Sequence, residues 1–261
     1  MSHLIPRSQI LYCFEAILHA PYEGQWDKLE SLVQPTVSIN NESLQRDAFI
    51  AHLRSNVETN TSSKLDSSVV DVEAQAIAAR IIKTQSTSSE EASTAQPVQF
   101  QEIMLAWFTD GRLSAIKSLQ DNDARRARVQ SAIETPTPLL ESSSPTTVDL
   151  ASTYRQYIGS INDKTMEATF GKFCKPLVTH NNHEKTISDY ISLIQESQEA
   201  IQGLYFYIQD LFVDKVSGRV AARLEFTGVP VKTWANAEPN GQGVKFHEHV
   251  MYWFDEGKIH W

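Results

Sequence analysis

Hydrophobic residues along the chain follow two spacings, and these spacings occur twice in the same order. A spacing of three or four residues predicts two helical pieces within residues 8–34, broken near residues 20–24, and a helix over 46–56. Alternating or continuous apolar runs then predict strands at 68–74, 76–84, 98–108 and 113–119. The second half repeats this order, with helices at 154–173 and 188–200 and strands at 205–214, 219–227, 244–254 and from 258 onward. Helices followed by hairpin-linked strands predict an α+β fold with an antiparallel sheet.

A repeat of a whole domain explains this order. Residues 98–114 align without a gap with residues 244–260. The identical pairs are Val98/Val244, Phe100/Phe246, Glu102/Glu248, Trp107/Trp253, Phe108/Phe254 and Gly111/Gly257. Upstream, Ala79-Arg80-Ile81 matches Ala222-Arg223-Leu224. A match of this length predicts two copies of one domain, because short structural repeats would recur at much closer spacing.

Pro, Ser and Thr dominate residues 135–147, where no hydrophobic periodicity survives. Such a composition predicts a flexible to semi-extended linker. We therefore expect a first domain over residues 1–130, a linker over 131–150 and a second domain over 151–261. The second copy stops directly after Gly257-Lys258-Ile259, which predicts either a short edge strand or a shortened chain.

Composition and charge argue against several classes of protein. The formal net charge of −9, spread evenly over both halves, argues against nucleic-acid binding. Cys13 and Cys174 fall among apolar neighbours, so we expect buried thiols and no disulfide framework. No apolar stretch approaches the roughly 18 residues of a membrane span, and the first residues lack the pattern of a signal peptide. The expected location is the cytoplasm.

The second copy resembles the SnoaL-like proteins of the nuclear transport factor 2-like superfamily, and fungal members in particular. The resemblance lies in the order of elements, in Phe-x-Glu-His-x-x-Tyr-x-Phe-x-x-Gly-Lys-Ile from Phe246 to Ile259, and in His180-Asn181 after a Pro-led strand. It implies two tandem cone-shaped α+β barrels, each a curved sheet with N-terminal helices, that form a pseudo-dimer within the chain. A further homodimer is compatible with it. It also implies proton-transfer chemistry without a cofactor or metal on an apolar small molecule.

Differences between the copies point to chemistry in the second. His180, His247 and His249 stand where the first copy has Ile39, Gln101 and Ile103 or close equivalents. Histidine exchanges protons near neutral pH, and a carboxylate in an apolar cavity has its pKa moved toward neutrality. Together with the resemblance, this predicts His180, His247 and Glu248 as the proton-transfer groups. The residues expected to bind or orient the substrate are Asn181, Tyr190, Arg223, Trp234, His249 and Tyr252.

Other readings of the same residues stay open. Glu248 and Arg223 lie on adjacent predicted strands and could form a buried structural pair, as Glu102 and Arg80 could in the first copy. His247 and His249 share one face of a strand, so they could bind zinc if His180 or Glu225 supplied a third ligand.

Two functions from different classes follow. The first is a cofactor-independent cyclase, isomerase or dehydratase of secondary metabolism, acting on a polyketide- or terpenoid-like substrate. The second is a non-catalytic pseudo-dimer that binds a ligand or a protein partner.

Overall fold

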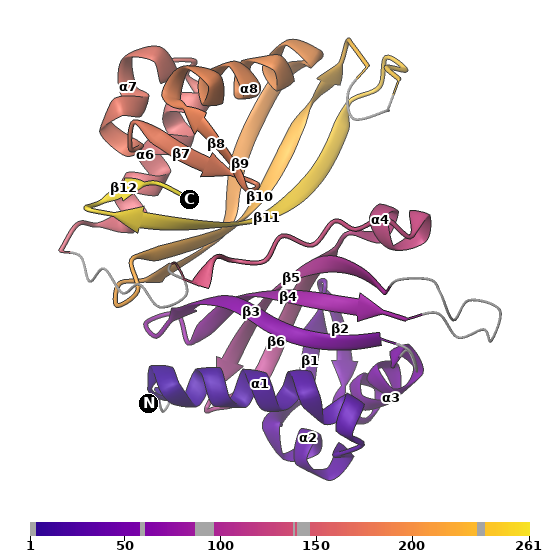
Figure 1. The fold of residues 1–261 in the computed structure, drawn as a ribbon. Coiled ribbons are helices and arrows are strands. Elements are labelled where there is room, and N and C mark those ends of the chain that lie inside the picture. Colours follow the sequence, from indigo (N-terminus) through magenta and orange to yellow (C-terminus); the bar gives the residue numbers. More distant parts are fainter. Residues whose placement is uncertain (1–3, 58–60, 87–96, 138, 140–146, 234–237) are drawn as a thin grey trace. The chain divides into compact units, whose positions relative to one another are not determined.

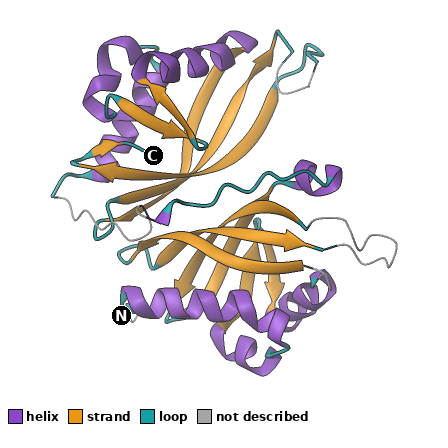
Figure 2. Cartoon of the chain, in the orientation of Figure 1, coloured by secondary structure: helices purple, strands orange, loops and turns teal. Residues whose placement is uncertain are grey.

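The computed structural model describes residues 4–57, 61–86, 97–137, 139, 147–233 and 238–261, so Trp234 lies outside the described residues. The chain divides into two compact units, Met1–Leu140 and Glu141–Trp261. Each unit combines helices with a curved sheet, and the order of helices and strands is the same in both except for a short helix after the last strand of the first unit (Figures 1 and 2). None of the described helices is both long enough and apolar enough to span a membrane.

The first unit contains one sheet of six strands with helices on one face (Figure 1). Its elements are α1 (Arg7–Glu23), α2 (Trp26–Leu32), β1 (Val33–Ile39), β2 (Glu42–Gln45), α3 (Arg46–Asn56), β3 (Thr61–Asp71), β4 (Ala76–Gln85), β5 (Val98–Thr109), β6 (Arg112–Gln120) and α4 (Asn122–Ala127). The strand order is β2-β1-β6-β5-β4-β3, and only the pairing of β1 with β6 is parallel. In each unit, the face of the sheet that packs against the helices is called the inner face. In the first unit these helices are α1 to α3. The opposite face is called the outer face.

The second unit contains a curved four-stranded sheet and a separate hairpin. Its elements are α6 (Leu150–Asn162), α7 (Met166–Phe173), β7 (Leu177–His180), β8 (His183–Thr186), α8 (Ile187–Ala200), β9 (Ile201–Asp214), β10 (Arg219–Pro230), β11 (Val244–Asp255) and β12 (Lys258–Ile259). The sheet order is β12-β11-β10-β9, all antiparallel, and β7 pairs with β8. The helix expected over 154–173 is two helices, because Asp163 to Thr165 form a turn between them.

Tight turns place the strands in register. Asp110 and Gly111 both have positive φ, 48° and 75°, and join β5 to β6 as the sequence predicts. A two-residue hairpin turn in which both central residues have positive φ matches the twist of the two strands that it joins. Asn181 and Asn182 form the same kind of turn between β7 and β8 with φ of 48° and 64°. Asparagine tolerates this conformation better than most side chains do, which explains the Asn-Asn pair locally.

A hydrophobic core fills the space between helices and sheet in each unit. In the first unit it joins Ile10 and Phe14 of α1 to Ile77, Ile81 and other strand residues. In the second it joins Tyr154, Ile158 and Phe170 of the helices to Val220 and Leu224 of β10. Cys13 and Cys174 are free and buried, as expected from their apolar neighbours.

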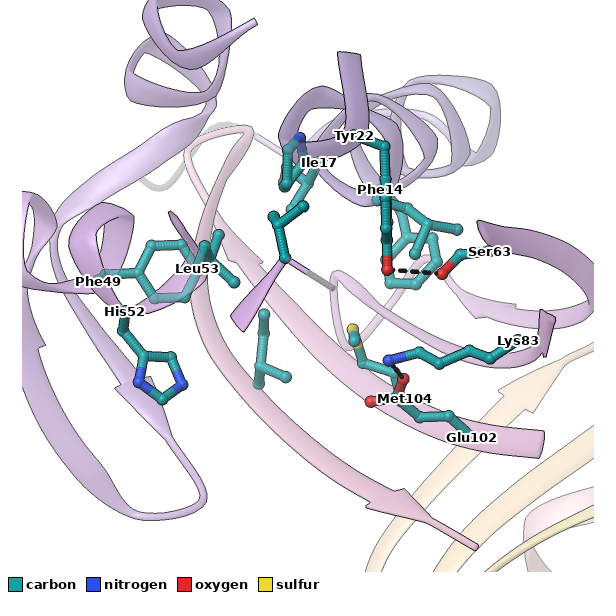
Figure 3. Close-up of a pocket in the computed structure, with 14 residues that line it drawn as sticks. Phe14, Ile17, Tyr22, Phe49, His52, Leu53, Ser63, Lys83, Glu102 and Met104 are labelled. Carbon is teal, nitrogen blue, oxygen red and sulfur yellow. Dashed lines mark hydrogen bonds and ion pairs between the residues drawn. The ribbon is translucent and has the colours of Figure 1, made fainter. Parts of the chain in front are cut away.

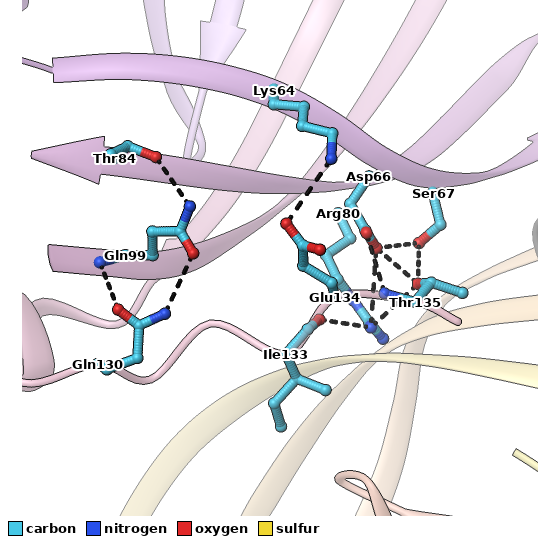
Figure 4. A network of polar contacts seen from close by, with 10 residues as sticks. All are labelled: Lys64, Asp66, Ser67, Arg80, Thr84, Gln99, Gln130, Ile133, Glu134 and Thr135. Carbon is cyan, nitrogen blue, oxygen red and sulfur yellow. Dashed lines mark hydrogen bonds and ion pairs between the residues drawn. The ribbon is translucent and has the colours of Figure 1, made fainter. Parts of the chain in front are cut away.

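The predicted linker begins later in the structure than residue 131. The amides of Ser131 and Ala132 donate to the Gln99 carbonyl at 3.0 and 3.2 Å. Thr135 is 5% exposed and donates through its amide and its hydroxyl to the Asp66 carboxylate at 3.0 and 2.6 Å (Figure 4). Residues 131–135 therefore belong to the first unit, because they satisfy polar groups on its outer face that composition alone does not reveal.

Candidate active site

Glu248 lies on the inner face of the second sheet, among apolar side chains. Residues of β11 alternate between faces, so Glu248 shares the inner face with Phe246, Val250 and Tyr252. Leu224 of β10 lies opposite Glu248 in the register. The hydrophobic core of the unit includes or contacts these apolar neighbours. The carboxyl group is thus held over the apolar interior of the curved sheet.

Two properties of Glu248 mark it as a candidate acid or base. The residue is exposed to solvent, yet the protein around it raises the pKa of its carboxyl through burial. No hydrogen bond or ion pair joins Glu248 to any residue that the structure describes. A carboxylate that water reaches, but that is partly desolvated and lacks a cation, is suited to take up a proton.

The matching carboxylate of the first unit is neutralised. Glu102 lies 2.7 Å from the Lys83 ammonium and also accepts a hydrogen bond from Ser118. Lys83 faces Phe100 in the register of the first sheet, and Phe226 faces Phe246 in the second. Phe226 therefore replaces Lys83 in the second unit, so Glu248 lacks the cation that Glu102 has.

Four tyrosines surround the inner face near Glu248. Tyr154 and Tyr157 come from α6, Tyr190 from α8 and Tyr252 from β11. The Tyr157 and Tyr190 hydroxyl oxygens are 2.8 Å apart, and the Tyr252 ring lies 5.2 Å from that of Tyr154 between centroids. We call these four residues the tyrosine cluster.

The tyrosine cluster holds protonated hydroxyls near the carboxylate. Burial, and after it the negative charge of Glu248, raises the pKa of Tyr252 to about 12. Burial likewise raises the pKa of Tyr154 well above its usual value, with a smaller contribution from Glu248. The Tyr154 hydroxyl is buried beside Tyr252, and its interaction with Tyr252 also raises its pKa. Both tyrosines therefore keep their protons near the carboxylate.

His180 borders the tyrosine cluster from the end of β7. Its ring lies 5.4 Å from the Tyr190 ring between centroids. Burial lowers the pKa of His180, and the positive charge of Lys185 lowers it further. Asn181, the neighbouring turn residue, is exposed and lies 3.4 Å from His180 between Nδ2 and Nε2. The positive φ of Asn181 gives it a role in the hairpin turn.

His247, His249 and Arg223, which were also predicted as site residues, lie on the outer face. His247 Nε2 is 3.0 Å from Glu225 Oε2, and Lys245 Nζ is 2.8 Å from the same carboxylate. Lys245 and then His247 lower the pKa of Glu225 through these contacts. Arg223 lies opposite His249 in the register, on the same outer face. The structure thus does not bring His247 and Glu248 to one site.

The expected pair of Glu248 with Arg223 is wrong for the same reason. In the first unit, Arg80 is on the outer face, 3.9 Å from Asp66, whereas Glu102 faces inward to Lys83. A shift of one residue in the pairing of two strands moves a side chain to the other face of the sheet. The Glu and the Arg that occur in both copies therefore lie on opposite faces in each unit. Among the described residues, no group of three or more His, Cys, Asp or Glu could hold a metal ion.

Tyr154 and Tyr157 are site residues that the sequence analysis did not select. A tyrosine on the apolar side of a helix is most often part of the core. The sequence did contain one indication of their position: Tyr154 and Tyr157 are three residues apart, on the same face of α6 as Leu150 and Ile161. Only the fold shows that this face meets Glu248.

Comparisons relate the second unit to a known family. The family model of SnoaL-like polyketide cyclases matches residues 151–261. A solved SnoaL-like polyketide cyclase from Agrobacterium tumefaciens is 31% identical, over 44% of this chain and 87% of its own, with a TM-score of 0.41. The chain belongs to the SnoaL-like family. All residues that the family model matches lie in the second, SnoaL-like unit.

Other solved structures are similar at lower identity. TsrD from Streptomyces laurentii is 18% identical over 47% of this chain and 96% of its own, with a TM-score of 0.39. An LEH-like epoxide hydrolase from M. tuberculosis is 14% identical over 45% of this chain and 86% of its own, with a TM-score of 0.36. No curated protein matches the chain.

Proposed function

We propose that the SnoaL-like unit is a cofactor-independent acid/base enzyme, a cyclase, isomerase or dehydratase, that acts on an apolar carbonyl compound of secondary metabolism. One observation carries the proposal: Glu248 has a raised pKa and no cation on an apolar, water-accessible inner face. Family membership supports the same class of chemistry, since its model is that of polyketide cyclases.

Glu248 is the base in this proposal. Its carboxylate takes a proton from the carbon next to the substrate carbonyl, and the electron pair of that C–H bond moves toward the carbonyl oxygen. Return of the proton to another atom completes an isomerisation, whereas attack of the carbanion on a second carbonyl closes a ring. A positioned general base contributes roughly a hundredfold to ten-thousandfold to the rate of such a step.

The tyrosine cluster stabilises the charge that develops on the substrate oxygen. The Tyr154 hydroxyl is suited to this role, because it is buried and interacts electrostatically with both Tyr252 and Glu248. Tyr252 keeps its proton at neutral pH, since its pKa is about 12. Donors that are already in place cost no reorganisation when the charge forms. His180 acts through Tyr190, which it contacts, and not on the substrate directly.

Hydrogen–deuterium exchange on 1-tetralone, an apolar enolisable ketone, tests the proposal. The full-length protein is expected to accelerate loss of the C2 proton signals in D2O, followed by NMR. Glu248→Gln should lose about a hundredfold or more of that acceleration. His247→Gln, on the outer face, is the matched control and should keep it. A wild-type protein without acceleration, or a Glu248→Gln variant with full rate, would favour the non-catalytic binding alternative.

A further inference from the structure

The first unit contains a cavity of about 180 Å³ between its helices and the inner face of its sheet (Figure 3). Most of its wall is apolar and includes Phe14 of α1, Phe49 and Leu53 of α3, Met104 of β5 and Ile116 of β6. An apolar cavity of about 150 Å³ is large enough to bind benzene. This cavity therefore has room for one ring with a short substituent.

Two polar pairs open onto this apolar wall. Lys83 and Glu102 form an ion pair of 2.7 Å, with side chains 19% and 7% exposed. On another part of the wall, the Ser63 hydroxyl donates to the Tyr22 hydroxyl at 2.9 Å (Figure 3). A buried ion pair contributes little to stability compared with apolar residues of the same volume, because both charges must be desolvated. Its presence in an apolar cavity is thus better explained by binding.

Hydrogen-bond donors are in excess at this wall. The Lys83 ammonium has three protons; it is paired with Glu102 and donates one proton to the Gln120 side-chain oxygen, 3.3 Å away. Tyr22 accepts the Ser63 proton and keeps its own for donation. A bound molecule with one acceptor oxygen can satisfy these donors. Because Lys83 and Glu102 cancel each other's charge, the complementary molecule is neutral.

We propose that the first unit binds a small neutral apolar molecule with a single carbonyl or ether oxygen, and that it does not transform this molecule. Glu102 is paired with Lys83 and accepts from Ser118, so it is a poor proton acceptor. The cavity lies wholly in the first unit, outside the residues that match the SnoaL-like family. It is thus a second binding site in the chain, distinct from the one that contains Glu248.

The test compares two probes of the same shape on the full-length protein. Acetophenone has the carbonyl oxygen, and α-methylstyrene replaces it with a CH2 group. With 13C-labelled methyl groups, acetophenone is expected to shift the NMR signals of Leu53, Met104 and Ile116 saturably. α-Methylstyrene should bind about tenfold more weakly, as expected for the loss of a hydrogen bond to a charged donor.

Three variants locate the binding. Leu53→Trp fills the cavity and should abolish the shifts, while its unperturbed methyl spectrum elsewhere shows that the protein is folded. Tyr22→Phe separates the two donors: it should weaken acetophenone binding if Tyr22 is the donor and leave it unchanged if Lys83 is. Glu248→Gln should bind acetophenone in the first unit as the wild type does, whatever its effect on catalysis.

Two results would overturn the proposal. Acetophenone that shifts no methyl group of the first unit, or that still binds there in Leu53→Trp, excludes this cavity as the site. Equal affinity for acetophenone and α-methylstyrene excludes a ligand recognised by its oxygen. If Glu248→Gln loses ketone exchange but still binds acetophenone in the first unit, then binding in the first unit does not depend on the site that contains Glu248.

Discussion

The Lys83 ammonium is 2.7 Å from the Glu102 carboxylate on the inner face of the first sheet, and Phe226 replaces this lysine in the second. This single exchange gives the two units carboxylates of different character at matching positions. Glu102 forms an ion pair with Lys83. Glu248 lies among apolar side chains and the tyrosine cluster, and burial raises its pKa. This difference underlies the two proposals, binding in the first unit and proton transfer in the second.

The first prediction concerns the stability that this ion pair controls. Lys83→Met should lower the free energy of unfolding of the protein by about 3 kcal/mol near neutral pH, because it leaves a buried carboxylate unpaired. Urea denaturation followed by circular dichroism measures the loss. The double variant Lys83→Met/Glu102→Gln should recover most of it, since no buried charge remains. A double variant as unstable as the single one would show that Lys83 acts through packing alone.

The second prediction concerns the pH dependence of stability at Glu248. The folded protein raises the pKa of this carboxyl above its ordinary value of 4.5, so the folded state binds the proton more tightly than the unfolded chain does. Ionisation of Glu248 therefore costs the folded state stability as pH rises through the raised pKa, and has no effect below the unfolded value. Glu248→Gln, neutral at every pH, should have a higher Tm than the wild type near pH 8. The difference should vanish near pH 4.

Thermal denaturation of both proteins across this range checks the sign. Glu238→Gln, which removes an exposed carboxylate of the same unit, is the control for the loss of one negative charge. A Glu248→Gln variant that is less stable than wild type near pH 8 would contradict the raised pKa.

The third prediction separates two tyrosines of one helix. Tyr154 lies beside Tyr252, with 5.2 Å between the ring centroids, whereas the Tyr157 hydroxyl is 2.8 Å from that of Tyr190. Tyr154→Phe should slow ketone exchange by about tenfold or more, because it removes a buried donor near Glu248. Tyr157→Phe should instead lower stability by about 1 kcal/mol, because Tyr190 loses its partner. Paired measurements of Tm and exchange rate distinguish them, and a Tyr154→Phe variant with normal rate would remove this residue from the site.

The fourth prediction concerns the segment that crosses the outer face of the first sheet. Arg80 donates to the Ile133 carbonyl at 3.2 Å and lies 3.9 Å from Asp66, which in turn accepts from Thr135 (Figure 4). Burial lowers the pKa of Arg80 to about 10. Asp66→Asn should destabilise the protein by about 3 kcal/mol, because the buried guanidinium loses its counter-charge. Thr135→Val should cost about 1–2 kcal/mol.

Limited proteolysis after residue 130 gives an independent measurement of the same network. Asp66→Asn should release residues 131–135 from the sheet and expose them to cleavage. Gln130→Ala, which removes only an exposed contact with Gln99, is the control and should be cut as slowly as the wild type. Equal cleavage of all three proteins would show that the segment is held by other contacts.

Local patterns in the sequence predicted most of the helices and the long strands in their order, but not the short strands β1 and β2 or the break between α6 and α7. Apolar spacing and the Asp110-Gly111 turn depend on residues near one another in the chain, so they identify helices, strands and hairpins without the fold. The same period of two predicted that Glu248 points to one face of its strand and that His247 and His249 point to the other face. The repeat of Phe, Glu, Trp and Gly positions likewise pointed to two matching units.

Contacts between distant residues decided the site. The sequence of β10 alone does not show that Leu224, and not Arg223, lies beside Glu248. That depends on the register between strands, which is set by the turn and by which side chains the helices bury. The fold alone also places Lys83 against Glu102, Thr135 against Asp66 and Tyr154 near Glu248. The sequence thus determined several residues that could carry chemistry, and the packing of sheet against helices placed Glu248, but not His247 or His249, beside the tyrosine cluster.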